Sequence, residues 1–496
     1  MRNKKLLLAF MSSAALLAAA CNPGVDEQKQ PEQEPVVTEP ATTTAEPTPT
    51  GVPSPTEVPY RDLGGMEIII GNHWTPEMPA MIPEWQPDPV EKYREELMEK
   101  YNFTIMKKCV AGWGEMVDEY VNSVLEGTPS AQIYELDYRF VATPMTEGLF
   151  YDLATLEELD FSEDKWNDSV RELMTVGDHV YGMKAGASEP RGGVIFNKRL
   201  FEEAGLDPNL PYDLQASGEW TWSKFEELCE ILTRDTDGDG QTDVYATVSQ
   251  GGTTLQTLVA STGEDFVGED ENGLIYNNLE SENVQKAMEF AVDLYRKGYE
   301  MPQPEDSQWD YFEGAFLEEK AAMQFNEIWT CQESGPYGDD MGDTVGFVMP
   351  PKPDGAESYC SYVCDDIVVI PSCYDEETAS DIAFAYNLYT SQLMVEEGGE
   401  GWQDYYGFAF WYTKIVDGEK EYFTDERVAD ETLAYFADAT KVKQLKTPVV
   451  YELGNVIGES LLWNYPFETT LPADQVKLIA KEWDALIAET NKNRQK

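Results

Sequence analysis

Histidine is nearly absent from this chain. Only His73 and His179 occur in 496 residues. A Ser-His-Asp hydrolase, or a zinc site with histidine ligands, would have to use one of these two side chains. Carboxylate pairs of the glycosidase type are not excluded, because 93 acidic residues produce such pairs by chance. The composition therefore favours binding over catalysis, and we expect the protein not to be an enzyme.

Basic residues are also few. The chain has 35 lysines and arginines against 93 aspartates and glutamates, which gives a formal net charge of -58. Such a surface repels phosphate backbones and anionic lipid head groups. Nucleic acid is thus excluded as an expected partner. With 42% apolar residues, the chain is still long enough for two lobes with separate cores.

Cysteines do not follow a metal-binding pattern. The cysteines after Cys21 are Cys109, Cys229, Cys331, Cys360, Cys364 and Cys373. Their spacing repeats no zinc motif. Outside the cell a disulfide between some pair is permitted, and buried free thiols are an equal alternative. The connectivity stays open.

Long apolar runs are confined to the N-terminus. Residues 6–20 follow three basic residues and end in small side chains before Cys21. This is the arrangement of a secretory signal, and the run is too short to span a membrane with ease. Residues 17–21, LAAAC, resemble a bacterial lipobox, except that the leucine lies four residues before the cysteine instead of three.

The lipobox resemblance implies that residues 1–21 are a lipoprotein signal peptide and that Cys21 is lipidated. The alternative is an ordinary secreted protein with a free cysteine. Residues 22–59 contain nine prolines, seven threonines and no aromatic residue. Such a segment buries too little apolar surface to offset the entropy of ordering it, so we expect a disordered tether. A long tether suits a lipid-anchored protein on the outer face of a Gram-positive cell membrane.

Strands and helices alternate in the next part of the chain. Apolar strands are predicted at 66–70, 103–109 and 132–136, with helical patterns at 90–101 and 115–125. This order is typical of a parallel sheet flanked by helices. Ligands on such sheets bind beyond the carboxyl ends of the strands. The loops that follow the first and third strands contain the candidate binding residues His73, Trp74, Asp137 and Arg139.

The stretch 193–247 combines four local signals. An apolar strand at 194–196 precedes a short helix that ends at Gly205. Thr221 can cap a second helix, and Ser223 with Glu226 has the spacing of a capping box. An aspartate-rich loop follows this helix.

That aspartate-rich loop has the order of a calcium-binding loop. Its candidate ligands are Asp235, Asp237, Asp239 and Asp243, with a backbone carbonyl from Gln241. Hard carboxylate oxygens at this spacing suit Ca²⁺, and a glycine at position six permits the sharp turn. Ala246 stands where the bidentate glutamate would be. We expect a structural calcium ion; the alternative is a solvated acidic turn.

Several of these motifs together resemble a known family. FNK, LF, AGL, TW and DTDGDG within 193–247, HVYGM at 179–183 and the AAM at 321–323 resemble the extracellular solute-binding proteins of bacterial ABC importers, the family of maltose-binding protein. The resemblance covers most of residues 60–395. The C-terminal hundred residues match nothing that we can name.

The resemblance implies a two-lobed α/β fold in which each lobe is a mostly parallel sheet flanked by helices, with a hinge between the lobes. It places residues 60–188 and 355–395 in the first lobe and residues 189–354 and 396–496 in the second. The crossings are expected near 184–192 and 349–362. Glycine, proline and other turn-forming residues in both stretches agree with this.

The chain is rich in rings that suit a sugar. It has 12 tryptophans and 27 tyrosines, and flat rings pack on sugar faces while nearby polar groups bond to the hydroxyls. Most such rings belong to the core, Trp222 among them. The resemblance singles out Trp329, after the AAM strand, and we expect it to face Trp74 across the ligand. The other expected partners are Glu189, Arg191 and Glu327, with Trp411 and, less directly, Trp113 and Trp402 as further rings.

These observations predict a monomeric lipoprotein that captures a carbohydrate, an oligosaccharide in particular, between its lobes. The resemblance implies that it delivers the sugar to the membrane subunits of an ABC permease. The alternatives are a binder of peptides or other polar solutes and, from another class, a secreted carbohydrate-active enzyme or adhesin. The sugar and its linkage do not follow from the sequence.

Overall fold

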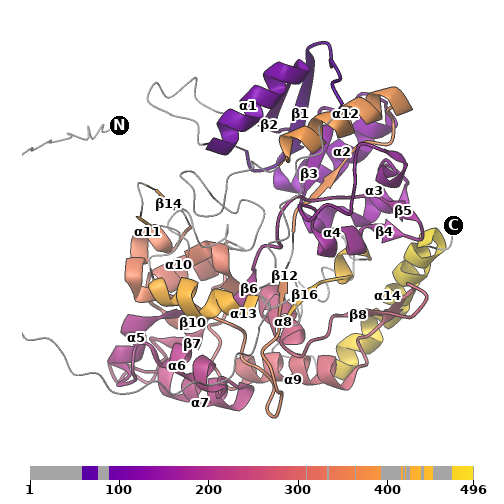
Figure 1. Ribbon diagram of the computed structural model, residues 1–496. Coiled ribbons are helices and arrows are strands. Elements are labelled where there is room, and N and C mark those ends of the chain that lie inside the picture. The colour runs from indigo at the N-terminus through magenta and orange to yellow at the C-terminus, as the bar shows by residue number, and fades with distance from the viewer. Residues whose placement is uncertain are drawn as a thin grey trace, which may run out of the picture. The chain divides into compact units, whose positions relative to one another are not determined.

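Two four-stranded sheets organise the chain (Figure 1). The structure is a computed structural model, and it describes residues 59–75, 89–308, 310–331, 335–363, 365–391, 415–416, 419–420, 425–436, 441–450 and 472–494. Cys21 and the proline-rich segment 22–58 lie outside the described residues. We call the part around the first sheet the first lobe and the part around the second sheet the second lobe.

The sheet of the first lobe has the strand order β13-β3-β1-β2. Its strands are β1 (Met66–Asn72), β2 (Phe103–Cys109), β3 (Ile133–Leu136) and β13 (Ile367–Val369). β1 pairs in parallel with β2 and with β3, as the alternation of strands and helices predicts. β13 runs antiparallel to β3, and it begins at the edge of the sheet where β3 ends.

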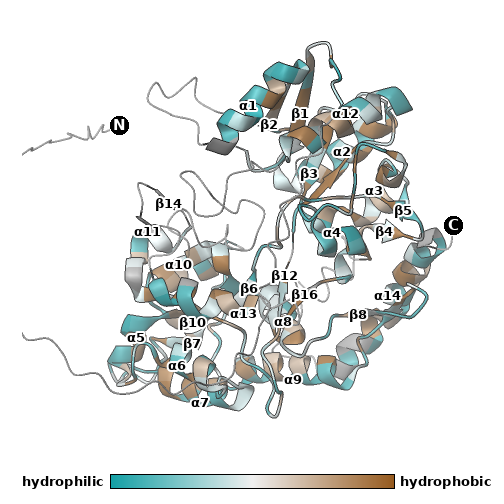
Figure 2. Ribbon diagram, viewed as in Figure 1, coloured by the Kyte–Doolittle hydropathy of each residue, from teal (hydrophilic) through white to brown (hydrophobic). Residues whose placement is uncertain are grey.

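Helices cover this sheet. The helices and short strands of the first lobe are α1 (Pro89–Tyr101), α2 (Met116–Leu125), α3 (Ala142–Thr146), α4 (Asp168–Leu173), β4 (Thr175–Val176), β5 (His179–Val180) and α12 (Glu376–Tyr389). Tyr120 of α2 packs edge-on against Tyr134 of β3, and Tyr101 of α1 packs edge-on against Phe384 of α12. In Figure 2 β3 is largely brown, whereas α1 and α12 show both teal and brown residues. Both helices thus combine polar residues with apolar residues, as expected for helices that cover a sheet.

The sheet of the second lobe has the strand order β11-β6-β10-β7. Its strands are β6 (Gly192–Asn197), β7 (Tyr245–Thr247), β10 (Ala321–Glu327) and β11 (Val345–Val348). β6 runs antiparallel to both β10 and β11, and only β7 and β10 pair in parallel. The expectation of a mostly parallel sheet is therefore wrong for this lobe. β6 leaves the first lobe and β11 leads back toward it, so the two neighbouring strands must run in opposite directions.

Further helices and a hairpin complete the second lobe. They are α5 (Lys198–Glu203), α6 (Leu210–Ser217), α7 (Trp222–Leu232), α8 (Gly251–Ser261), β8 (Val267–Glu269), β9 (Ile275–Asn277), α9 (Glu282–Arg296), α10 (Tyr311–Leu317) and α11 (Gly338–Met341). Thr221 caps α7 by accepting a hydrogen bond from the Lys224 N–H. The predicted capping box does not form, because Thr221 is the N-cap and Ser223 lies within α7, where its hydroxyl donates to Asp354.

The C-terminal part of the chain adds short elements and one long helix. These are β14 (Ile415–Val416), β15 (Glu419–Lys420), the π-helix Val428–Thr432, α13 (Leu433–Phe436), β16 (Val442–Gln444), the 3₁₀ turn η8 (Thr447–Val449) and α14 (Pro472–Arg494). α14 contacts β9 and α9 of the second lobe and also α3 of the first. Among the described residues, none of the helices has both the length and the apolar composition needed to cross a membrane.

The two crossings between the lobes lie against each other. Met183 bridges Val368, and Pro190 bridges Val363 of β12 (Ser361–Val363). A Cβ atom on Gly192 would lie 2.1 Å from the Tyr362 ring, so a larger residue at this position would displace that ring. On its other side β12 pairs in parallel with β16, so a C-terminal strand joins the crossings.

Candidate functional site

The loop after β1 presents an exposed tryptophan. Asn72, at the end of β1, is fully buried, and its side-chain oxygen accepts hydrogen bonds from the N–H groups of Trp74 and Thr75. This turn directs the chain away from the sheet and leaves Trp74 40% exposed. His73 packs edge-on against the Trp74 ring at 4.7 Å. Burial lowers the pKa of His73, so its imidazole is neutral at neutral pH.

The loop after β3 holds an ion pair at the same edge of the sheet. Asp137 caps the 3₁₀ turn η2 (Tyr138–Phe140) by accepting from the Arg139 N–H at 2.9 Å. The Arg139 guanidinium returns to the same carboxylate with bonds of 2.7 and 2.6 Å. Burial raises the pKa of Asp137, but Arg139 outweighs it through charge and hydrogen bonds, so that the pKa lies below its usual value. The Arg139 Cζ also lies 5.2 Å from the ring centre of Trp113.

A second ion cluster joins the crossing to the end of β10. Arg191 donates to Glu189 Oε2 at 2.7 Å and to Glu327 Oε2 at 3.1 Å. The indole Nε1 of Trp329 donates to the same Glu327 oxygen at 2.8 Å. Burial raises the pKa of Glu189, which the charges of Arg191 and Lys184 only partly offset. Trp329 is thus held at its nitrogen while 38% of the residue stays exposed.

The structure brings these two clusters into electrostatic range of each other. The charge of Arg191 lowers the pKa of Asp137, and the charge of Glu327 raises that of Arg139. Among the described tryptophans, Trp74 and Trp329 are the two that are exposed. Two exposed rings and several buried ion pairs are therefore contributed by the ends of β1, β3 and β10 and by the first crossing.

Three residues of this site were missed by the sequence reasoning. Lys184 pairs with Asp365 at 3.2 Å, and Asp365 also accepts from the Glu189 N–H at 2.9 Å. Asp366 follows directly and precedes β13, whose first residue pairs with Leu136. Because β13 is antiparallel to β3, its beginning lies at the carboxyl edge of the parallel strands. The available signal was the apolar run DIVVIP at 366–371, which follows the return crossing.

The Asp366 carboxylate differs from its neighbours. It accepts no hydrogen bond from any residue that the structure describes. Burial raises its pKa to about 7; the charges of Lys184 and Arg191 lower the pKa, while those of Glu135 and Asp137 raise it. Glu135 itself is paired with Lys107 at 2.7 Å.

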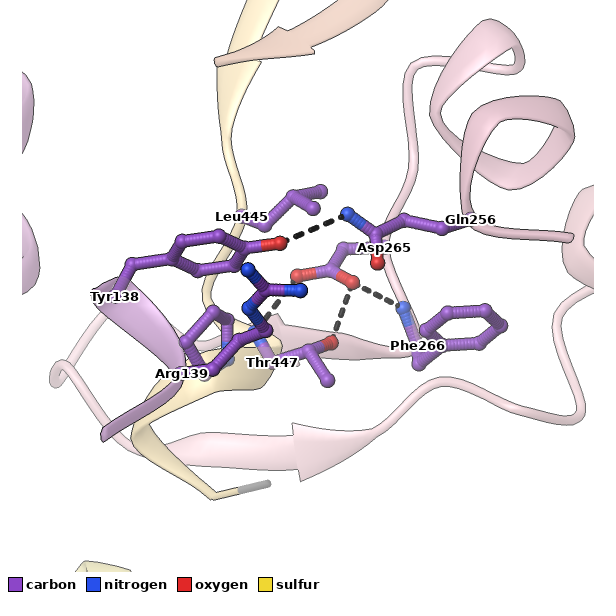
Figure 3. A pocket seen from close by; sticks show the side chains of 8 residues that line it. Tyr138, Arg139, Gln256, Asp265, Phe266, Leu445 and Thr447 are labelled. Atoms are coloured by element: carbon purple, nitrogen blue, oxygen red, sulfur yellow. Dashed lines mark hydrogen bonds between the residues drawn. The ribbon is translucent and has the colours of Figure 1, made fainter. Parts of the chain in front are cut away.

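A small pocket lies beside Arg139 (Figure 3). Its walls are Tyr138, Arg139, Gln256, Asp265, Phe266, Leu445, Thr447 and Pro448. Gln256 Nε2 donates to the Tyr138 hydroxyl at 3.5 Å, which links α8 to η2. The buried Asp265 carboxylate accepts from the backbone N–H groups of Lys446 and Thr447 at 2.7 and 2.8 Å. At this pocket the segment 445–448 thus packs against residues of both lobes.

The aspartate-rich loop lies away from these strand ends, after α7. Oxygens of Asp235, Asp237 and Asp239 lie within 4.8 Å of one another, and all three residues are exposed. Backbone N–H groups of the loop donate to these carboxylates, at 2.6 Å from Gly238 to Asp235 for example. The structure does not bring Asp243 into this group, because its carboxylate accepts from the N–H and hydroxyl of Thr236.

Several predicted residues fall outside the described part of the chain. These are Trp402, Trp411 and the lipidation candidate Cys21.

Comparison with known proteins gives one family and one fold. The sequence model of the family described as bacterial extracellular solute-binding protein matches residues 108–379, more than half of the chain. No curated protein matches the sequence.

Similar solved structures share the two-lobed fold. One is an ABC transporter solute-binding protein from Thermotoga lettingae TMO bound with alpha-D-tagatose, with a TM-score of 0.53 and 16% identity over 85% of this chain and 99% of that one. Another is the ABC transporter associated binding protein from B. animalis subsp. lactis Bl-04 in complex with beta-1,6-galactobiose, with a TM-score of 0.56 and 16% identity over 86% and 98% of the two chains. A third is an ABC substrate-binding protein from Listeria monocytogenes in complex with cycloalternan, with a TM-score of 0.54 and 14% identity over 85% and 99%.

Proposed function

The chain belongs to the bacterial extracellular solute-binding proteins, and on that premise we propose that it captures a carbohydrate, an oligosaccharide in particular, and delivers it to an ABC importer. The ligand occupies a cleft between the lobes. We assign residues 60–188 and 355–395 to the first lobe and residues 189–354 and 396–496 to the second. The protein binds its ligand and performs no catalysis.

The exposure of Trp74 and Trp329 is the observation that supports this proposal most strongly. An exposed tryptophan leaves apolar surface in contact with water unless a ligand or partner covers it. A sugar offers an apolar face of matching size. Trp329 is oriented by its bond to Glu327, so its ring is held in place before the ligand arrives. Preorganised rings of this kind reduce the entropy lost on binding.

The polar groups around the two rings suit hydroxyl recognition. The carboxylates of Glu189 and Glu327 pair with Arg191 and retain further lone pairs for hydroxyl donors. Asp366 offers both of its oxygens. The three similar structures described above contain sugars, and this agrees with the same assignment.

Two alternatives are less favoured. A peptide or other polar solute would also use charged groups, but two exposed indole faces suit a sugar better. A secreted enzyme would need an acid and a base placed across a scissile bond. The carboxylates of this site are instead paired with Arg139, Arg191 and Lys184, with Asp366 as the exception.

A glycan array with the purified protein tests the proposal. We expect retention of oligosaccharides on the array, with no product released when the retained sugar is incubated with the protein and analysed by chromatography. Binding confined to peptides would favour the first alternative. Released products would show an enzyme, and either outcome would refute the proposal.

We also propose that Cys21 is lipidated, so that a monomer is held on the outer face of the cell membrane beside its permease. The acidic surface suits a tethered monomer, because like charges oppose association. The support for lipidation is the order of basic residues, apolar run and LAAAC at the N-terminus.

Finally, we propose a structural Ca²⁺ in the loop after α7. The donor set fits, because three aspartate oxygens converge within 4.8 Å and hard oxygens are the ligands that Ca²⁺ prefers. Asp235, Asp237 and Asp239 would hold the ion. Gln241 and Asp243 would complete the shell, the latter after release from Thr236. The ion would neutralise three like charges and fix the connection between α7 and β7.

A further inference from the structure

The cations of the candidate site are all engaged. Arg139 pairs with Asp137, Lys184 with Asp365, and Lys107 with Glu135. Arg191 serves two carboxylates, Glu189 and Glu327. Because each guanidinium or ammonium already has a carboxylate partner, a charged group on a ligand would compete with an existing ion pair.

Asp366 adds to the negative excess that the five paired carboxylates and four cations already leave. It is the sixth carboxylate beside four cations, and the residues that the structure describes offer its oxygens no hydrogen bond. Its place before β13 puts it at the edge of the sheet where the loops after β1 and β3 lie. A ligand beside this edge therefore meets at least one carboxylate that has no salt-bridge partner among the described residues.

The stretches outside the described residues have few basic residues in their sequences. After residue 59, the stretches outside the described residues are 76–88, 332–334, 392–414, 417–418, 421–424, 437–440 and 451–471, apart from positions 309 and 364 and residues 495–496. Their sequences contain one basic residue, Lys414. The acidic residues in the same stretches are more numerous, Glu396, Glu397, Glu400 and Asp404 among them.

From this arrangement we propose that the site takes a carbohydrate without anionic groups and rejects uronic acids and sugar phosphates, with Asp366 as the specificity-determining residue. The inference rests on the proposed function and narrows its substrate class. Asp366 acts in two ways. It accepts hydrogen bonds from uncharged hydroxyl groups, which strengthens binding of a neutral sugar, and it repels a carboxylate or phosphate brought to the same edge.

Repulsion is large enough to decide specificity. Two like charges about 6 Å apart still repel each other strongly at an effective dielectric constant of about 20. This corresponds to a loss of affinity of at least about tenfold for an acidic ligand. Salt reduces the effect less in a partly buried site than on an open surface.

The test uses pairs of oligosaccharides that share length and linkage and differ only at C6 of one sugar, as hydroxymethyl or as carboxylate. Calorimetric titration of the wild-type protein at pH 8 should show the acidic member binding at least about tenfold more weakly. Asp366→Asn keeps an acceptor oxygen and removes the charge, so it should shrink this ratio toward one. The control variant is Asp178→Asn, because Asp178 is exposed in the turn between β4 and β5; it should leave the ratio unchanged.

The outcomes separate this inference from the proposed function. Equal or tighter binding of the acidic member would overturn the inference while carbohydrate binding stands. An unchanged ratio in Asp366→Asn would overturn the role of Asp366. If neither member of any pair binds, and no glycan on the array is retained, both the proposed function and the inference are overturned.

Discussion

Trp329 donates its indole N–H to Glu327 Oε2 at 2.8 Å, and Arg191 donates to the same oxygen at 3.1 Å. This shared carboxylate fixes the edge of the ring and leaves its face exposed. An aromatic side chain in the core would instead be covered on both faces, as Trp220 is. This contrast is the observation on which the proposed contact between Trp329 and a ligand rests.

Removal of calcium should destabilise the second lobe. Binding to the native state alone adds RT ln(1 + [L]/Kd), which is roughly 2.7 kcal/mol at a hundredfold excess over Kd. We therefore expect chelator to lower the Tm measured by calorimetry, and Asp237→Ala to abolish the difference between calcium and chelator. Asp207→Ala, an exposed aspartate outside the loop, is the control and should keep that difference. Superimposable melting curves for the wild type in calcium and in chelator would refute the calcium proposal.

Glu300 should make stability depend on pH. Its carboxylate accepts from the Ser249 N–H at 2.6 Å, but its second oxygen has no partner, and burial raises the pKa to about 7. A raised acid pKa means that the folded state holds its proton more tightly than the unfolded chain. The contribution of Glu300 to the free energy of unfolding therefore falls as pH rises from about 4.5 to about 7.

Glu300→Gln removes this penalty and keeps an acceptor for Ser249. We expect the variant to be more stable than the wild type by about 2 kcal/mol at pH 8, and the difference to shrink toward zero near pH 4.5, by urea denaturation at both pH values. Glu202→Gln, at an exposed position of α5, should show no such dependence. A difference in stability between the wild type and Glu300→Gln that is the same at both pH values would contradict the account.

Replacement of Cys21 should release the protein from the membrane. A covalent lipid contributes about 0.8 kcal/mol per buried CH₂, which a serine cannot replace. Cell fractionation of Cys21→Ser should find the protein in the medium, while the wild type stays with the membrane. Equal membrane retention of both would show that Cys21 is not the anchor.

Much of the fold follows from local sequence patterns. Apolar runs and alternating helices predict β1, β2 and β3 and their parallel pairing, and Thr221 predicts the start of α7. The direction of β6 does not follow from such patterns. It depends on where the chain crosses between lobes, which is a long-range property, and the parallel assignment of the second sheet failed for that reason.

The candidate site was predictable to a similar degree. The rule that ligands bind beyond the carboxyl ends of parallel strands points to Trp74, Asp137 and Arg139, which come soon after strands in the sequence. Asp366 was missed because it precedes its strand. Only the antiparallel pairing of β13 with β3, through Ile367 and Leu136, brings the beginning of that strand to the same edge.

The pairing of charges was also beyond sequence reasoning. Asp137 and Arg139 were expected as separate hydroxyl partners, whereas their side chains bond to each other. With 93 acidic residues in the chain, sequence spacing gives no indication of which carboxylate meets which cation. That choice is made by tertiary packing.

The central claim is that the ligand packs on Trp329. Titration calorimetry of the wild type and of Trp329→Ala with the tightest-binding oligosaccharide of the array tests it most directly, with Trp220→Ala as the matched core variant. Trp220 is fully buried and donates to the Met349 carbonyl at 2.8 Å, so its removal should lower stability by about 3 to 5 kcal/mol. We expect Trp329→Ala to melt like the wild type and to bind about 2 kcal/mol more weakly, roughly thirtyfold. A Trp329→Ala protein that binds the sugar as tightly as the wild type would contradict the account.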